Sequence, residues 1–333
     1  MREGNGVNMS RVKMAVAPVR ENDAEEQKKT LNKRSLSKSI SRNWQLYLMC
    51  LPGVLFMLLF AYKPMYGILV AFKDYNMRVG VWGSPWVGFE NFQRLFSSYW
   101  FPVILKNTIS LSLLSLVLGF PLPIILALIL NEVSHGRFRK TFQTISYAPH
   151  FISVVVLCGM VGLFLNPSSG IVNIIITRLG GESINFLQDA AMFKWVYVLS
   201  GIWQGLGWGS IIYFATLSGV DKSLLEAAEI DGANRFHKIW YINIPVLIPT
   251  IIILLILQCG SLLSVGYEKV YLLQNSTNLS GSEVISTYVY KVGLEQADFG
   301  FGTATDLFNA LVNTAILLSA NFLAKKTTAQ GLF

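Results

Sequence analysis

The most informative pattern of polar and small residues lies at 221–245, between two long apolar stretches. Asp221 or Ser223 is expected to begin a helix there, and Ser223 and Glu226 have the spacing of a capping box. Gly232 is expected to end that helix, because glycine takes a left-handed backbone conformation at little cost. Pro245 suits the first turn of the apolar helix that follows. The pattern predicts a short surface helix whose small residues let another protein approach closely.

Motifs of enzyme chemistry are missing from the sequence. Its three histidines do not form an HExxH or similar metal-binding pair. There is no GxxxxGKS/T phosphate-binding loop, so the chain is not expected to bind and hydrolyse ATP by itself, and there is no GxSxG nucleophile motif. The three cysteines lie in apolar stretches at no ligand or disulfide spacing. We therefore expect no catalytic residue, no metal site and no cofactor in this chain.

The composition indicates an integral membrane protein. The chain has 333 residues, of which 53% are hydrophobic and 14% charged, whereas soluble domains carry roughly 25% charged residues. Its mean hydropathy is +0.48. A bilayer core about 30 Å thick needs about 20 apolar residues per helix, and no alternating pattern of a membrane barrel recurs. We predict an all-α membrane protein with six transmembrane helices, at about 46–71, 107–130, 143–165, 194–217, 244–266 and 306–324.

Three regions follow from these spans. Residues 1–45 are basic and lack apolar periodicity, so we expect a mostly disordered tail. Residues 46–325 form the transmembrane domain, and residues 326–333 a cytoplasmic C-terminus. With the N-terminus inside, about twice as many Lys and Arg lie in the inner segments as in the outer ones, which fits the positive-inside rule. We predict a membrane protein with both termini cytoplasmic, whose excess of basic residues, part of a net charge of +8, faces anionic membrane lipid rather than nucleic acid.

The connection between predicted helices four and five, residues 218–245, resembles the EAA loop of permease subunits in ATP-driven, binding-protein-dependent importers (type I ABC importers). It has Glu-Ala-Ala, three residues, a glycine, and then twelve residues before a proline. The resemblance implies a cytoplasmic coupling helix that docks into a cleft of an ABC ATPase dimer, where ATP would be used. The residues to which it gives this coupling role are Glu226, Ala227, Ala228, Asp231, Gly232, Ala233, Phe236 and Pro245.

Four further motifs look like the polysaccharide or complex-oligosaccharide branch of the carbohydrate-uptake permeases. They imply a transporter of the bacterial plasma membrane. It would contain two homologous permeases, two ATPase copies and an extracellular sugar-binding protein, often a lipoprotein. That protein would dock on outward loops, chiefly 73–106 and 269–305, and the core helices would open outward and inward in turn. The motifs are Tyr62–Gly67, Ala71–Asn76, Gly83–Gly88 and Gln143–Ser153.

Uncharged polar and aromatic side chains inside the predicted spans could line a sugar path, because they replace the hydrogen bonds of water and stack on sugar rings. They suit neutral and uronic-acid oligomers alike. The same side chains also serve as hydrogen-bond contacts between helices. The series Gly201, Gly205 and Gly209 predicts close helix packing, inside this subunit or against a partner permease. The candidates for the path are Trp203, Gln204, Tyr213, Gln258, Asn309 and Asn313.

The alternative is a six-helix secondary carrier or channel that works without an ATPase. It would need a coupling-ion site within the membrane, and the predicted spans hold no carboxylate or lysine near mid-depth. It also leaves the pattern at residues 226–245 unexplained. The sequence therefore favours the permease subunit of an ATP-driven importer of oligosaccharides or polysaccharides.

Overall fold

The computed structural model describes residues 42–133, 136–328 and 331–332. These described residues are mainly helical and contain no β-strand, although an isolated antiparallel bridge joins Lys73 and Trp86. The predicted all-helical class is therefore confirmed. The predicted basic tail lies almost wholly outside the described residues. The chain divides into two compact units, residues 1–66 and 67–333, and each is described by itself.

The described part of the first unit is one helical stretch. α2 (Trp44–Met57) continues as the π-helix η1 (Leu58–Tyr62), and the 3-10 helix η2 (Lys63–Phe72) begins directly after it. Together they make a stretch of 29 residues that is long and apolar enough to cross a membrane. Every residue of α2 and η1 is exposed, and apolar side chains lie on all faces. A helix of this kind suits lipid rather than water, which agrees with the first predicted span.

Long helices form the body of the second unit, and three stretches of them could each cross a membrane. The 29-residue helix α10 packs against α5, α6 and α13. One cluster of buried apolar side chains surrounds Phe193 on α10, and a second surrounds Leu247 on α13. The three candidate stretches and α10 consist of α5 (Trp100–Gly119) with α6 (Pro121–Glu132), α12 (Arg235–Lys238) with η4 (Ile239–Asn243) and α13 (Ile244–Cys259), α17 (Phe299–Thr328), and α10 (Ala190–Ser218).

The third predicted span is not one straight helix. α7 (Gly136–Tyr147) runs into the 3-10 turn η3 (Ala148–Phe151), and α8 (Val154–Phe164) then leaves at an angle of 101°. Pro149 lacks a backbone donor, and Ser153 caps a new helix with its side chain. The continuous helix predicted there is therefore wrong. The described part of the chain holds four candidate spans, or five if the bent pair counts as one.

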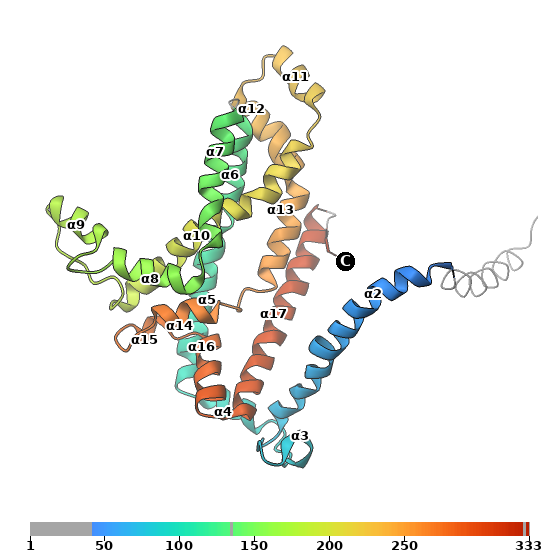
Figure 1. Ribbon diagram of the computed structural model, residues 1–333, viewed down its shortest axis with the longest axis vertical. Coiled ribbons are helices and arrows are strands. Elements are labelled where there is room, and N and C mark those ends of the chain that lie inside the picture. Colours follow the sequence, from blue (N-terminus) through green and yellow to red (C-terminus); the bar gives the residue numbers. More distant parts are fainter. Residues whose placement is uncertain (1–41, 134–135, 329–330, 333) are drawn as a thin grey trace, which may run out of the picture. The chain divides into compact units, whose positions relative to one another are not determined.

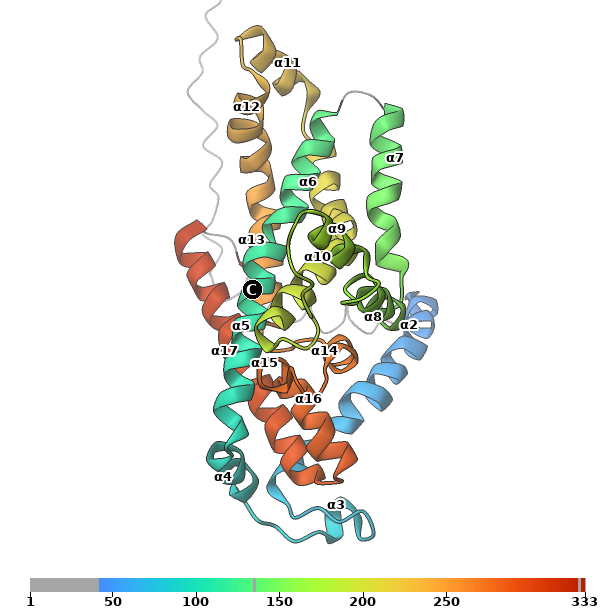
Figure 2. The same cartoon turned by 90° about the vertical axis from the view of Figure 1, so that its left-hand side faces the viewer.

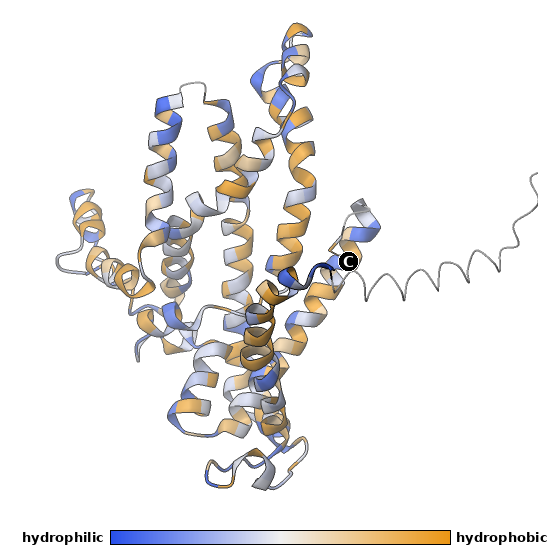
Figure 3. Ribbon diagram, turned by 45° about the vertical axis from the view of Figure 1, so that its right-hand side comes forward, coloured by the Kyte–Doolittle hydropathy of each residue, from blue (hydrophilic) through white to orange (hydrophobic). Residues whose placement is uncertain are grey.

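Short helices connect the long ones. Helices α11 and α4 lie at opposite ends of the second unit (Figure 1), and α14 and α16 lie beside α5 (Figure 2). Hydrophobic residues run along the long helices, whereas hydrophilic residues are more frequent at their ends (Figure 3). The short helices are α3 (Gly80–Gly83), α4 (Glu90–Ser97), α9 (Ile171–Arg178), α11 (Lys222–Ile230), α14 (Tyr267–Leu273), α15 (Leu279–Ser282), α16 (Ile285–Val289) and η5 (Tyr290–Glu295).

A buried polar network joins α15 and α16 to α5. The Glu283 carboxylate, on a residue only 3% exposed, lies 2.6 Å from Lys291 Nζ and accepts a hydrogen bond from the Thr287 hydroxyl at 2.9 Å. Asn107 of α5 donates from its side-chain amide to the carbonyls of Ser280 and Glu283, at 2.9 and 3.1 Å. A buried charge is tolerated only when it is paired and hydrogen-bonded, and this network meets that condition.

Candidate coupling and translocation sites

Helix α11 is closed at both ends by local hydrogen bonds. The Asp221 carboxylate accepts from the Ser223 backbone N–H at 2.9 Å, and this bond lowers the pKa of the carboxyl. Asp221 is therefore the N-cap, and the prediction of a capping box starting at Ser223 is wrong. At the other end Gly232 has a φ of 80°, and the Ala233 N–H donates to the Ala228 carbonyl at 2.8 Å. This is a Schellman-type end, as the glycine predicted.

The chain turns into α12 directly after that end. Asn234 caps α12 by accepting a hydrogen bond from the His237 backbone N–H at 2.9 Å. Lys238 Nζ lies 2.6 Å from Glu229 Oε1. The hydrogen bond and the charge of Lys238 lower the pKa of the Glu229 carboxyl. We call residues 221–245, which lie within the predicted loop 218–245, the coupling loop. They contain α11 and α12, which this ion pair joins, and then η4 and the first two residues of α13.

The coupling loop presents apolar side chains at its surface. Ile230 is 86% exposed and Phe236 81%. They lie on a segment at the end of the second unit (Figure 1). Large exposed apolar side chains next to charged ones are typical of a surface that another protein covers. Of the predicted coupling residues, those that are exposed are Glu226, Ala227, Asp231, Gly232, Phe236 and Pro245, and those that are partly buried are Ala228 and Ala233.

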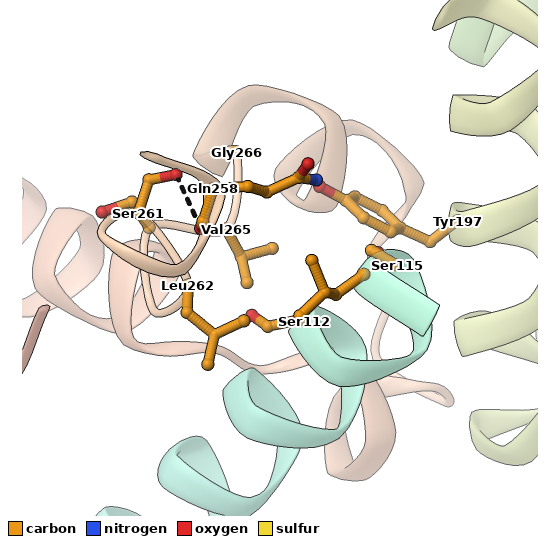
Figure 4. Close-up of a pocket in the computed structure, with 10 residues that line it drawn as sticks. Ser112, Ser115, Tyr197, Gln258, Ser261, Leu262, Val265 and Gly266 are labelled. Carbon is orange, nitrogen blue, oxygen red and sulfur yellow. Dashed lines mark hydrogen bonds between the residues drawn. The ribbon is translucent and has the colours of Figure 1, made fainter. Parts of the chain in front are cut away.

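A polar cavity of about 190 Å³ lies between α5, α10, α13 and the connection to α14. We call it the serine-lined cavity. Figure 4 shows the Tyr197 ring and the Gln258 side chain pointing toward each other across it. The Ser112 hydroxyl is buried and has no hydrogen-bond partner among the described residues. The cavity is lined by Ser112, Ser115, Leu116, Tyr197, Gln258, Ser261, Leu262, Ser264, Val265 and Gly266.

Of the six predicted path residues, Gln258 alone lines the serine-lined cavity within the described part of the chain. The sequence analysis missed Ser112, Ser115 and Tyr197. The signal for the two serines was their spacing of three residues, which places them on one face of a helix. A serine inside an apolar helix is equally consistent with packing, so that spacing did not distinguish a cavity wall from a helix contact.

Two other predicted path residues form hydrogen bonds at places where a helix is interrupted. The Gln204 side-chain amide donates to the Ile152 carbonyl at 2.8 Å, at the bend between η3 and α8. Asn313 accepts from the Leu263 N–H at 2.9 Å and donates to the Ser264 hydroxyl at 3.0 Å. Both side chains thus bind backbone or loop groups that a regular helix would have satisfied.

The remaining predicted path residues lie in different surroundings. Tyr213 is 3% exposed and belongs to the apolar cluster around Leu247. Trp203 lines an apolar cavity of about 600 Å³ between α8, α9 and α10. The Asn309 Oδ1 atom is buried without a hydrogen-bond partner among the described residues. None of these three residues lines the serine-lined cavity.

The predicted glycine series on α10 does not form one packing face. A Cβ on Gly201 would lie 3.0 Å from Lys269 Nζ, and one on Gly209 would lie 3.2 Å from the Pro123 ring, whereas one on Gly205 meets nothing within 4 Å. The tight contact is at Gly207, where a Cβ would lie 2.1 Å from the Ser146 carbonyl oxygen. Close packing of α10 against α7 therefore depends on a glycine outside the predicted series.

Known proteins resemble this chain over most of its length. Residues 119–328 match the family described as binding-protein-dependent transport system inner membrane component. The chain is 45% identical to the polygalacturonan/rhamnogalacturonan transport system permease protein YteP of Bacillus subtilis (strain 168), covering 92% of this chain and 95% of that protein. It is 43% identical to protein LplB of the same organism, covering 89% and 93%.

A solved structure agrees with these relatives. It is a crystal structure of a bacterial alginate ABC transporter in complex with an alginate pentasaccharide-bound periplasmic protein. One of its chains is 42% identical to this one, with a TM-score of 0.82 and coverage of 89% of this chain and 99% of that one. The resemblance read from the residues around Gly232 is thus confirmed: the chain belongs to the family of inner membrane components of binding-protein-dependent transport systems.

Proposed function

We propose that this chain is one of two permease subunits in an ATP-driven importer and forms half of its translocation path. The observation that carries the proposal is the coupling loop, with its capped helix, its ion pair and its exposed apolar side chains. Counting the bent pair α7–α8 and α10 with the four candidate spans gives six crossings. Both termini and the coupling loop then lie on the cytoplasmic side, as the distribution of basic residues requires.

In this proposal α11 is the coupling helix. Ile230 and Phe236 enter an apolar cleft of an ABC ATPase, and burying them supplies the affinity. The ion pair between Glu229 and Lys238 holds α11 and α12 together, so that movement of the ATPase is passed on to α13. ATP is bound and hydrolysed in the ATPase dimer, and this chain supplies neither a catalytic residue nor a cofactor.

We further propose that the serine-lined cavity is one wall of the sugar path. Hydroxyl and amide groups are the donors and acceptors that a saccharide needs when it leaves water. The unpaired Ser112 hydroxyl and the Gln258 amide would bind the substrate directly, and Tyr197 offers a ring face for stacking. Gln204 and Asn313 act beside the path by fixing the bend and the loop next to it. The partner permease would supply the opposite wall.

The names and titles of the related proteins suggest which class of substrate this chain transports. YteP is named for the transport of polygalacturonan and rhamnogalacturonan, and a solved bacterial ABC transporter with the same identity to this chain, 42%, is involved in the import of the acidic polysaccharide alginate. We therefore propose that this importer takes oligosaccharides that contain uronic acids. An extracellular sugar-binding protein would deliver them to the outward loops at 73–106 and 269–305. A polar cavity of about 450 Å³ lies there, beside the exposed ion pair of Arg94 and Asp298 at 2.7 Å.

The coupling role is tested by co-purification of the ATPase with the tagged permease complex, together with ATP-dependent uptake in proteoliposomes. Ile230→Ser removes an apolar side chain that the ATPase would bury. We expect retention of the ATPase and uptake to fall about tenfold, the effect of losing one interface contact of roughly 1–2 kcal/mol. The matched control is Leu179→Ser, because Leu179 is 83% exposed and lies outside the coupling loop.

Equal retention of the ATPase by the Ile230→Ser and Leu179→Ser variants would exclude docking through α11. Uptake against a gradient by the permease without any ATPase would instead support the secondary carrier.

A further inference from the structure

A buried lysine lies behind the serine-lined cavity. Lys269, on α14, is only 8% exposed. Its Nζ atom donates to the Tyr197 carbonyl at 2.7 Å and lies 4.5 Å from the centre of the Tyr197 ring. Gly201, one helical turn after Tyr197, allows this approach, because a Cβ there would lie 3.0 Å from Lys269 Nζ. The amine is therefore fixed against α10 rather than extended into solvent.

Lys269 has no carboxylate partner among the described residues. The ion pairs found there join other basic residues to acids, and one of them shows the contrast: Lys291 lies 2.6 Å from the buried Glu283 carboxylate. Glu268, next to Lys269 in the chain, is exposed and forms no such pair. A carbonyl oxygen and a ring face compensate a buried ammonium group only in part. Burial lowers the pKa of Lys269 to about 8, so the amine is still mostly protonated at pH 7, and no carboxylate among the described residues pairs with it.

This charge lies next to the serine-lined cavity. Tyr197, whose ring and carbonyl contact Lys269, also lines the cavity. Gly266, three residues before Lys269, lines it too. The described residues that line the cavity carry hydroxyl, amide and apolar groups and no charge, so none of their side chains opposes the field of the lysine. Water is scarce around the buried amine, and a field is screened less there than at the surface.

We propose that Lys269 is a specificity-determining residue that makes the serine-lined cavity favour saccharides with carboxylates over neutral saccharides. The inference rests on the proposed function, since it treats the cavity as a wall of the sugar path. The carboxylate of a uronic-acid unit in the cavity is attracted by the ammonium group across the Tyr197 ring, while its hydroxyls bind Ser112 and Gln258. A neutral sugar has only the second set of contacts. The preference for acid thus comes from a residue outside the cavity wall.

The test uses two probes with the same sugar chain, trigalacturonate and its trimethyl ester, in which three methyl groups replace the three negative charges. Binding of each to the purified permease–ATPase complex is measured by saturation-transfer NMR, without the extracellular binding protein, so that the selectivity of that protein does not contribute. The wild-type complex should bind the acid more tightly than the ester. Lys269→Met should lower the ratio of acid to ester affinity roughly tenfold, the effect of one unit charge at about 10 Å in a partly screened medium.

The control is Lys194→Met, which removes the same charge from a less buried lysine on α10 and should leave the ratio unchanged. Unchanged ester binding by the Lys269→Met complex shows that the variant is folded. If that variant does not assemble, the same ratio is measured with Lys269→Gln, which keeps a donor for the Tyr197 carbonyl. A wild-type complex without preference for the acid, or an assembled uncharged variant with the wild-type ratio, overturns the inference. Neither result bears on the coupling role, which is tested separately by retention of the ATPase.

Discussion

Packing of α10 against α7 gives a prediction with an internal control. A Cβ on Gly207 would lie 2.1 Å from the Ser146 carbonyl oxygen and 2.4 Å from its carbon, so Gly207→Ala forces the two backbones apart by about 1 Å. Overpacking of this size costs about 1–3 kcal/mol. Gly205→Ala, two residues away on the same helix, meets nothing within 4 Å. Alanine favours the helix over glycine by about 1 kcal/mol at either position, so the difference between the variants isolates the steric cost.

The assay is thermal unfolding of the purified complex in detergent, followed for wild type and both variants under one set of conditions. We expect Gly205→Ala to be as stable as wild type or more stable, and Gly207→Ala to be about 1–3 kcal/mol less stable than Gly205→Ala. Equal midpoints for the two alanine variants would refute the contact between α7 and α10. A midpoint for Gly205→Ala below that of Gly207→Ala would show that the tight face of α10 has been misassigned.

Two further perturbations act on single hydrogen bonds. Gln204→Leu leaves the Ile152 carbonyl without its side-chain donor at the bend. The expected loss of local stability is about 1–3 kcal/mol, measured as faster hydrogen exchange after residue 152. Gln204→Glu should disturb the bend at least as much, because a carboxylate cannot donate. The ion pair of Glu229 and Lys238 makes the coupling loop sensitive to acid. The pKa of Glu229 is lower in the folded loop than in the unfolded chain, so the pair stabilises the loop above the ordinary glutamate pKa and the contribution is lost as pH falls through the lowered value. Protection of α11 amides from hydrogen exchange should fall over that acidic range, and Lys238→Met should abolish the pH dependence.

The sequence predicted the all-helical class of the protein and the short helix that ends at Gly232 well, because both depend on local patterns. Long apolar stretches need a membrane whatever their neighbours are, and a glycine at the end of a short helix takes a positive φ by its own chemistry. Gly232 shows this directly, with a φ of 80°. The sequence left the N-cap open between Asp221 and Ser223, because they lie two residues apart and both have a side chain that can cap; the structure selects Asp221.

The bend and the cavity wall were harder to predict, because they depend on contacts between distant residues. Pro149 marks a weak point in the helix, but the direction in which α8 leaves depends on packing and on Gln204, which lies 52 residues away. Lys269 illustrates the same limit. Near a predicted helix end it is an ordinary interfacial lysine, and only the fold brings it against Tyr197.

The buried network around Glu283 has a mechanical consequence. Asn107 binds the carbonyls of Ser280 and Glu283, and the acid is bound in turn by Lys291 and Thr287. If one of these groups shifted, its neighbour would be left without a hydrogen-bond partner in a low-dielectric interior. The network therefore opposes sliding of α5 past residues 280–291. We therefore expect α5 and the segment from α15 to η5 to move together when this region is displaced.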